Sequence, residues 1–175
     1  GEEIYLQFDG VNSTAEVFFN GKSLVVHHGG YSTFRVKLDD IKDENLLVVS
    51  ADNSPNNFVY PQMADFTFYG GIYRDVSAIG VPKKHFDLDY YGGPGISVTP
   101  EIDGADAAVN IDVFLTNPKA DQELMYLLKD RDGNIVAADK VSASETSVTF
   151  RIRNVHLWNG KKDPYLYTAD VCLVD

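Results

Sequence analysis

The sequence predicts an all-β protein with two consecutive regions, of which the second is an immunoglobulin-like sandwich. Apolar and polar residues alternate with a period of two along many short stretches, as in strands that bury one face. Turn-forming pairs such as Asn20-Gly21, Gly92-Gly93 and Asp132-Gly133 separate these stretches. No stretch carries the 3.6-residue periodicity of an amphipathic helix, so we expect strands and turns throughout.

Residues 1–82 form the first predicted domain. Asn20-Gly21 is its strongest turn signal, because a type I′ hairpin turn needs a positive φ at both central residues. The continuous apolar run Leu46-Leu47-Val48-Val49 favours a strand buried on both faces. Residues 53–62 are rich in Asn and Pro and predict an irregular loop. The other strands are expected at residues 4–8, 15–19, 23–27, 34–38 and 76–81.

A domain boundary is predicted at Pro82-Lys83-Lys84-His85, which is polar, marked by proline and set between two strand patterns. Residues 83–175 form the second predicted domain. About seven short strands separated by turns are typical of an immunoglobulin-like sandwich. Antibody-type paired cysteines are absent, because Cys172 is the only cysteine. The clearest strands are expected at residues 86–90, 109–115, 124–128, 135–141, 148–152 and 165–173.

Charge and composition exclude several classes of function. The formal net charge is −11 and no basic run occurs, which argues against nucleic acid and anionic membranes as partners. No apolar stretch approaches the roughly 20 residues of a membrane-spanning helix. The sequence begins and ends inside strand patterns, so we expect a segment of a longer protein. Localisation stays open between bacterial cytoplasm, periplasm and secretion.

The stretch from Asp65 to Val76 is the first candidate site. An aromatic loop leads into Gly70-Gly71, and this pair leads into a β-branched strand. Glycine tolerates positive φ and lets a ligand or another backbone approach closely. Such a loop can hold the carboxylate of Asp65 at the rim of a rigid sheet, where binding residues are often found. A tight corner packed with aromatic side chains is the simpler interpretation.

The residue types of other common active sites show no matching pattern. His27 and His28 would face opposite sides of a strand, and His85 and His156 lie far away in the sequence, so no shared metal site is predicted. No pair of carboxylates stands out for glycosidase chemistry. A Gly-x-Ser-x-Gly nucleophile elbow and a glycine-rich phosphate loop are also missing from the sequence.

Three further features have a structural and a functional interpretation. Asn12-Ser13-Thr14 fits the N-glycosylation pattern, but a turn is the favoured interpretation. Cys172 is most simply a small apolar strand residue. Trp158 with its aromatic neighbours Tyr165 and Tyr167 can stack on a sugar ring, but a core cluster at the end of a sandwich is favoured.

Several segments together resemble glycoside hydrolase family 2. Residues 8–13, 17–22 and 29–34 resemble its sugar-binding domain, and Glu44 to Val49 is close to that domain's wording GENLLAV. Residues 65–76 resemble the D-x-x-x-x-x-G-I-[FY]-R-D-V segment of the β-galactosidase branch. His156-Leu157-Trp158 and residues 164–168 resemble the end of the family's immunoglobulin-like domain. These segments span nearly the whole chain in the family's order.

The resemblance implies a partial jelly-roll, galactose-binding-like sandwich for residues 1–82 and an immunoglobulin-like sandwich for residues 83–175. It also implies a catalytic (β/α)8 barrel in the same chain, outside these residues, as a partner. The acid/base and nucleophile glutamates belong to that barrel, so catalytic residues are not expected here. The segment alone should be inactive, although the whole enzyme would be a β-galactosidase-like glycosidase acting on a carbohydrate substrate.

The resemblance assigns one functional residue, Asp65. The matching acid of such β-galactosidases reaches the active site, contacts galactose hydroxyls and helps to ligate a monovalent cation. Asp65 is therefore expected to be both a substrate-binding residue and a metal ligand for that monovalent cation, such as sodium, in the whole enzyme. Magnesium is the alternative ion expected for the whole enzyme. No cofactor is expected for this segment alone. Arg74 and Asp75 also match the family pattern and are interpreted as structural.

Other functions remain open from the sequence. β-Glucuronidase and β-mannosidase are the near alternatives within the family, although the Asp65 loop favours galactosidase. A non-catalytic carbohydrate-binding module would need an exposed aromatic platform, whereas the aromatic residues here are mostly expected in the core. A structural or adhesive pair of sandwiches is the third alternative. Family enzymes often associate through their sandwiches, so a homo-oligomer stays open, although the sequence does not determine the oligomeric state.

Overall fold

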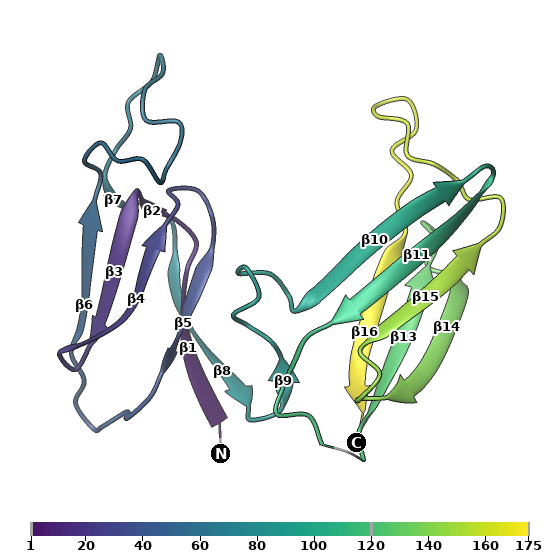
Figure 1. The fold of residues 1–175 in the computed structure, drawn as a ribbon, viewed down its shortest axis with the longest axis horizontal. Coiled ribbons are helices and arrows are strands. Elements are labelled where there is room, and N and C mark those ends of the chain that lie inside the picture. Colours follow the sequence, from purple (N-terminus) through teal and green to yellow (C-terminus); the bar gives the residue numbers. More distant parts are fainter. Residues whose placement is uncertain (1, 120, 175) are drawn as a thin grey trace. The chain divides into compact units, whose positions relative to one another are not determined.

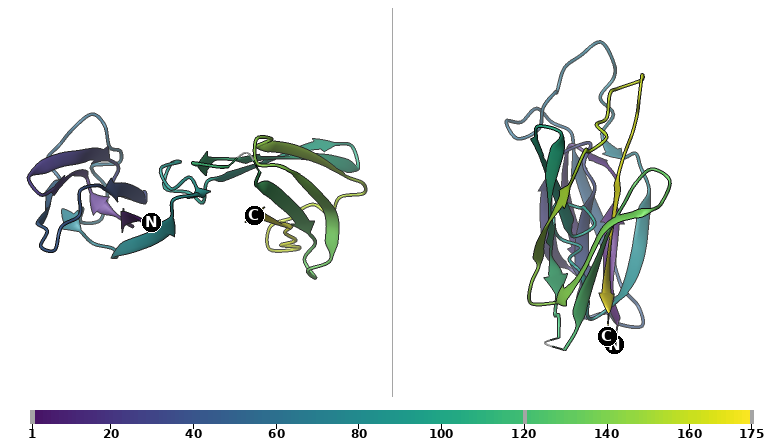
Figure 2. Two further views of the ribbon diagram at one scale, coloured as in Figure 1. Left: turned by 90° about the horizontal axis from the view of Figure 1, so that it is seen from below. Right: turned by 90° about the vertical axis from the view of Figure 1, so that its right-hand side faces the viewer.

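A computed structural model describes residues 2–119 and 121–174, and these residues form strands and loops only (Figures 1 and 2). No helix occurs among them, in agreement with the predicted all-β class. Consequently the described residues include no helix that is long and apolar enough to cross a membrane.

The chain folds as two compact units. Unit 1 comprises Gly1–Lys83 and Leu88–Pro94, and unit 2 comprises Lys84–Asp87 and Gly95–Asp175. The strands of unit 1 are β1 (Glu2–Phe8), β2 (Val11–Asn12), β3 (Thr14–Phe19), β4 (Lys22–His28), β5 (Phe34–Leu38), β6 (Leu47–Asp52), β7 (Gly71–Ile72) and β8 (Val76–Pro82).

Unit 1 is a sandwich of two three-stranded antiparallel sheets. One sheet has the order β5-β1-β8 and the other β4-β3-β6, and the short strands β2 and β7 pair separately (Figure 1). Alternate residues of β3 point into a core in which the rings of Phe8 and Phe34 stack 4.9 Å apart. The predicted hairpin at Asn20-Gly21 is confirmed, since both residues have a positive φ, 51° and 83°.

The prediction for Leu46-Leu47-Val48-Val49 was partly wrong. The segment does form a strand, β6, but Leu47 is 39% exposed and Val48 is 47% exposed. β6 is the outer strand of its sheet, so it has a neighbouring strand on one side only within the described chain. An apolar run predicts the strand, whereas its burial depends on what packs against it.

Unit 2 is a second sandwich. Its strands are β9 (His85–Phe86), β10 (Ile96–Asp103), β11 (Asp106–Val113), β12 (Leu115–Thr116), β13 (Glu123–Lys129), β14 (Ile135–Ser142), β15 (Ser147–Ile152) and β16 (Thr168–Val174). One sheet has the order β10-β11-β15 and the other β14-β13-β16, while β9 pairs with β12. Alternate residues of β11 and β13 are buried, and the core lies between the two sheets.

Two strand predictions in unit 2 need correction. β10 was missed, because its residues are largely exposed and Pro100 interrupts the apolar alternation. The last strand begins at Thr168 rather than at Tyr165, since residues 154–167 form an extended loop closed by a bridge between Asn159 and Asp163. This loop, called the Trp158 loop below, carries the exposed side chain of Trp158.

Candidate functional site

Asp65 lies in the loop of residues 53–70, called the Asp65 loop, between β6 and β7 of unit 1. The C-terminal end of the Asp65 loop is fixed where β7 pairs with β2, because Asn12 pairs with Gly71 there. The Asn12 side chain donates a 2.6 Å hydrogen bond from Nδ2 to the carbonyl oxygen of Tyr69. Asn12 is almost fully buried, so this bond ties the end of the loop to the sandwich.

Two side-chain amides hold the first half of the loop. Oδ1 of Asn56 accepts bonds of 2.9 Å from the backbone N–H groups of Phe58 and Val59. Across the loop, Gln62 donates a 2.7 Å bond to the carbonyl oxygen of Val59 and another to that of Asn56. Oε1 of Gln62 accepts a 3.0 Å bond from the N–H of Asn56. Side chains therefore satisfy backbone groups that no strand pairing reaches.

The aromatic residues of the Asp65 loop lie mostly on the surface, which corrects the expectation that they form core. Tyr60 is 91% exposed, and Phe66 and Tyr69 are also exposed. Phe58 stacks on His28 with 4.6 Å between ring centroids, and Phe66 packs against Phe68 at 4.7 Å. Val59 is the buried anchor of the loop. An exposed aromatic ring close to a carboxylate is a combination that suits the apolar faces and hydroxyls of sugars.

Asp65 itself is exposed. Asp65 does not line either of two hollows that are lined by other residues of the loop. Met63 lines an open hollow of about 490 Å³ with Asn56 and Tyr60. Phe66 lines a smaller one of about 140 Å³ with Tyr31 and Tyr73. Asp65 is thus an exposed carboxylate whose sequence neighbours Met63 and Phe66 line two different hollows.

The described residues do not assemble a metal centre around Asp65. No group of three or more His, Cys, Asp or Glu side chains within residues 2–119 and 121–174 is placed to hold a metal ion. One carboxylate supplies too few of the oxygen ligands that sodium or magnesium requires. Asp65 could complete such a site only with ligands from elsewhere, so its role as a metal ligand stays a proposal.

The backbone around the loop is supported by Tyr73 and Arg74. The hydroxyl of Tyr73 donates a hydrogen bond to the carbonyl oxygen of Gly30, and Nη1 of Arg74 reaches the carbonyl oxygens of Asp9 and Tyr31 at 3.4 and 3.3 Å. At the start of the loop, hydrogen bonds from Ser54 to the Asp52 carboxylate lower the pKa of Asp52. These contacts agree with the structural role that the sequence assigned to Arg74.

The structure also places the other candidate residues. His27 and His28 have different neighbours, as predicted: His27 stacks on Phe34 at 4.2 Å, whereas His28 stacks on Phe58. Asn12 and Ser13 are buried, so the glycosylation pattern is inaccessible in the folded protein. The expectation for Trp158 was wrong, because its side chain is 64% exposed on the wall of an apolar hollow.

Comparisons with known proteins agree with this architecture. The family model described as "Glycosyl hydrolases family 2, sugar binding domain" matches residues 1–82, and the model described as "Glycosyl hydrolases family 2" matches residues 94–175. The chain belongs to glycosyl hydrolase family 2. The two matches account for nearly all residues of the chain. The sugar-binding model matches the region of the first sandwich, and the second model matches the region of the second sandwich.

Relatives in family 2 include enzymes with two activities. A β-glucuronidase of Bacteroides fragilis is 32% identical over 99% of this chain, and the β-galactosidase large subunit of Leuconostoc lactis is 29% identical over all of it. The chain spans 27% of the length of each of these relatives. The matched region is thus about a quarter of either enzyme.

Solved structures of family 2 proteins share the fold. The FMN-binding β-glucuronidase from Facaelibacterium prausnitzii L2-6 superposes with a TM-score of 0.86 at 38% identity, covering 99% of this chain and 27% of that one. A putative β-galactosidase from Bacteroides fragilis gives a TM-score of 0.86 at 32% identity, covering 100% of this chain and 28% of that one.

Sequence reasoning missed the side chains that shape the Asp65 loop. Asn12, Asn56 and Gln62 were not predicted to have a role in the site, yet their side chains hold the loop backbone. The concentration of Asn and Gln in residues 53–62 was the available signal, because such side chains commonly bond to nearby backbone groups. Which carbonyl each amide reaches depends on the folded path of the loop.

Proposed function

We propose that this chain is a non-catalytic N-terminal portion of a family 2 enzyme that hydrolyses terminal β-linked sugars. The described residues contain no helix, so a (β/α)8 barrel with its catalytic glutamates is not among them. The two sandwiches would act as a scaffold for that barrel, which is the proposed partner in the same chain. By themselves they should not hydrolyse a glycoside.

The geometry of the Asp65 loop is the observation that supports the proposal most strongly. A rigid sandwich holds it through Asn12, and it presents one exposed carboxylate among exposed aromatic rings. Asp65 would accept hydrogen bonds from sugar hydroxyls, because an ionised carboxylate is an acceptor only. It would also supply one oxygen to a sodium or magnesium ion completed by residues of the barrel.

The sugar specificity is proposed in order of preference. β-Galactosides come first, because residues 65–76 resemble the segment found in β-galactosidases. β-Glucuronides come second, because relatives at 32% and 38% identity bear the name β-glucuronidase. β-Mannosides come third and rest on the family alone.

The test is hydrolysis of nitrophenyl β-galactoside, β-glucuronide and β-mannoside by the complete protein that carries these residues. Asp65→Ala should lower kcat/KM on the preferred sugar by at least about a hundredfold, since a charged hydrogen-bond partner of the substrate is lost. Asp43→Ala, an exposed acid elsewhere in unit 1, is the matched control and should leave kcat/KM unchanged. Equal activities of the Asp65→Ala variant and the parent on the hydrolysed sugar would refute the role of Asp65.

A second candidate function is a carbohydrate-binding module without catalysis. The exposed rings of Tyr60, Phe66 and Tyr69 favour it, because such a module needs aromatic side chains that are free to stack on sugars. The 175-residue chain should then bind galactose or glucuronate by itself, with affinity lost in Tyr60→Ala. Absence of hydrolysis by the complete protein together with binding by this chain would establish this alternative.

A further inference from the structure

A hollow in the Asp65 loop has the size of a small-molecule site. Its volume is about 490 Å³, within the range of about 300–1,000 Å³ that is usual for such sites. The smaller hollow beside Phe66, at about 140 Å³, falls below that range. The larger one is called the Tyr60 hollow below, and it is lined by Asn56, Asn57, Val59, Tyr60, Gln62 and Met63.

Hydrogen bonds hold the walls of the Tyr60 hollow in place. Nδ2 of Asn56 donates to the carbonyl oxygen of Ser54 at 3.1 Å and to Oγ of Ser13 at 3.3 Å. Ser13 is buried in the sandwich, and Gln62 bonds to the backbone of Asn56 and Val59 across the loop. A ligand would therefore meet side chains that are already positioned, which reduces the conformational entropy lost on binding.

Two kinds of side chain in the hollow remain available to a ligand. Asn56 and Gln62 use their amides on the loop itself, whereas the exposed amide of Asn57 makes no hydrogen bond to any described residue. Tyr60 and Met63 are 91% and 90% exposed, so the apolar surface of the ring and of the thioether is free. Of the residues that the structure describes, no Lys, Arg, Asp or Glu lines the hollow.

This lining suits an uncharged pyranose ring. The C–H groups on one face of a pyranose pack on an aromatic ring, and its hydroxyls pair with an amide, which both donates and accepts hydrogen bonds. A uronic acid or a phosphate would lose water from its charge without gaining a cation as a partner, and this desolvation opposes binding. The chemistry of the hollow therefore selects a neutral sugar.

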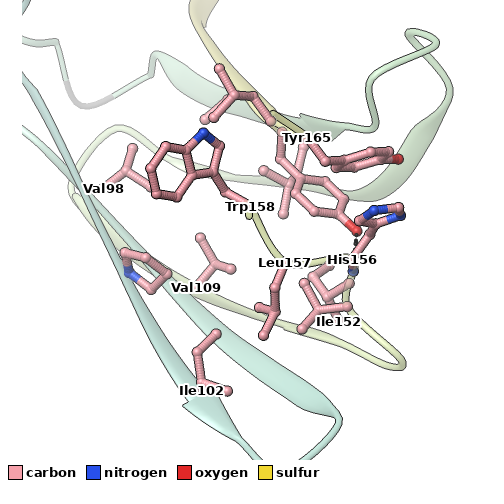
Figure 3. A pocket seen from close by; sticks show the side chains of 14 residues that line it. Val98, Ile102, Val109, Ile152, His156, Leu157, Trp158 and Tyr165 are labelled. Atoms are coloured by element: carbon pink, nitrogen blue, oxygen red, sulfur yellow. Dashed lines mark hydrogen bonds between the residues drawn. The ribbon is translucent and has the colours of Figure 1, made fainter. Parts of the chain in front are cut away.

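The apolar hollow beside the Trp158 loop of unit 2 is less suited to a sugar. Its volume is similar, about 530 Å³, but Figure 3 shows the aliphatic side chains of Val98, Ile102 and Leu157 around it. Aliphatic walls of this kind would leave hydroxyl groups of a sugar without hydrogen-bond partners, which is unfavourable. The Tyr60 hollow, with its free amide, is the better of the two sites.

The place of the Tyr60 hollow in the chain links it to Asp65. Met63 precedes Asp65 by two residues and Tyr60 precedes it by five. An extended chain spans at most about 3.6 Å per residue, so the Cα atoms of Met63 and Tyr60 lie within about 7 and 18 Å of the Cα atom of Asp65. A substrate whose terminal sugar contacts Asp65 would bring its next sugar within reach of the hollow.

We propose that the Tyr60 hollow binds the leaving sugar of the substrate, an uncharged pyranose on the far side of the bond that is hydrolysed. The ring of Tyr60 stacks on this sugar, and the amide of Asn57 bonds to its hydroxyls. The preferred substrates are then oligosaccharides with a neutral sugar next to the terminal one. This role depends on the one proposed above for Asp65, because Asp65 positions the terminal sugar.

The test compares leaving groups in the complete protein that carries these residues. Three substrates share the terminal sugar that the protein hydrolyses: its methyl β-glycoside, its β-linked disaccharide with glucose and its β-linked disaccharide with glucuronate. Methanol is too small to fill the hollow. The ratio of kcat/KM for the glucose disaccharide to kcat/KM for the methyl glycoside, called the leaving-sugar ratio below, therefore reports on binding there.

Substitutions in the hollow should change the leaving-sugar ratio. Tyr60→Ala should lower it about tenfold through loss of stacking, and Tyr60→Phe should retain it. Asn57→Ala should lower it about fivefold, since one hydrogen bond to the leaving sugar is lost. Tyr91→Ala is the matched control: Tyr91 is 90% exposed, like Tyr60 at 91%, but it does not line the hollow, so the ratio should keep the parent value.

Two further substrates test the chemistry of the leaving group. The glucuronate disaccharide should have a kcat/KM at least about tenfold below that of the glucose disaccharide, because its carboxylate finds no cation in the hollow. Equal values would contradict a site for neutral sugars. A phenyl β-glycoside tests an aromatic leaving group. If Asn57→Ala lowers kcat/KM as much for the phenyl glycoside as for the glucose disaccharide, the hollow does not recognise sugar hydroxyls and the proposal fails.

The outcomes also separate this proposal from the role of Asp65. Asp65→Ala should lower kcat/KM for all of these substrates and keep the leaving-sugar ratio near the parent value. If Asp65→Ala does so but Tyr60→Ala also keeps the parent ratio, the hollow is not the site of the leaving sugar, although the proposed function stands. If the complete protein hydrolyses none of the glycosides, both proposals are wrong.

Discussion

The guanidinium of Arg35 donates a 2.7 Å hydrogen bond from Nη1 to the carbonyl oxygen of Gly93. The same nitrogen donates to the carbonyl oxygen of Leu88 at 3.0 Å, and Nε donates to Gln7 at 2.7 Å. Gly92 has a φ of +67° and passes so close to Thr33 that a Cβ there would lie 2.2 Å from a backbone oxygen. Arg35 thus fastens the segment Leu88–Pro94 to unit 1, although the residues just before it belong to unit 2.

Arg35→Lys should loosen this segment. Lysine cannot reproduce the planar arrangement of donors that reaches Gln7 and two carbonyl oxygens together, so about 2 kcal/mol of local stability should be lost. Hydrogen exchange measured by mass spectrometry should become about thirtyfold faster in residues 88–94. Lys37→Gln removes a cation from the same strand and should leave exchange in residues 88–94 unchanged.

Gln62→Ala should increase the mobility of the Asp65 loop. The substitution removes two donors and one acceptor that serve the backbone of Asn56 and Val59. We expect exchange in residues 56–62 to become about a hundredfold faster, since three bonds of about 1 kcal/mol each are lost. Asn57→Ala is the control, because Asn57 is exposed on the same loop. If both variants exchange alike, the amides do not hold the loop.

His27 should make the stability of the protein depend on pH. Burial is the main cause that lowers the pKa of His27 below its ordinary value of 6.5. The unfolded chain therefore takes up this proton at a higher pH than the folded one. The free energy of unfolding should therefore fall as pH decreases below 6.5. Well above pH 6.5, His27 is neutral in both states and does not make the free energy of unfolding depend on pH.

The measurement compares the parent with His27→Gln in urea unfolding at several pH values between about 8 and 5. The loss of stability toward low pH should be smaller in the variant, whatever the difference between the two proteins at pH 8. Parallel pH profiles would show that the folded environment of His27 does not disfavour its protonation.

Leu124→Ala should destabilise unit 2. Leu124 is fully buried in the core between the sheets, so its truncation leaves a cavity and costs about 2–5 kcal/mol. Leu127→Ala, on the same strand with a half-buried side chain, should cost clearly less. Denaturant unfolding followed by the fluorescence of Trp158 measures both. Equal losses would contradict the assignment of Leu124 to the core.

Local patterns in the sequence were enough to predict the all-β class of the protein and many of its strands. The alternation at residues 109–113 and 124–128 predicted β11 and β13 correctly, because a period of two is imposed by the strand itself. Asn20-Gly21 predicted its hairpin for the same kind of local reason, since the turn conformation selects these residues. The family segments were recognised from residues alone, and their order agrees with the two matches.

Which apolar and aromatic side chains are buried depends on how the strands pack in the folded chain. Leu47 and Trp158 were both expected inside, yet β6 is an outer strand and Trp158 lines an open groove. No local sequence pattern predicted the hydrogen bonds of Arg35 to Leu88 and Gly93, or that of Asn12 to Tyr69. The chemistry of a side chain determines how strongly it prefers to be buried. Its actual burial requires neighbours from distant parts of the chain, and these come together only when the chain folds.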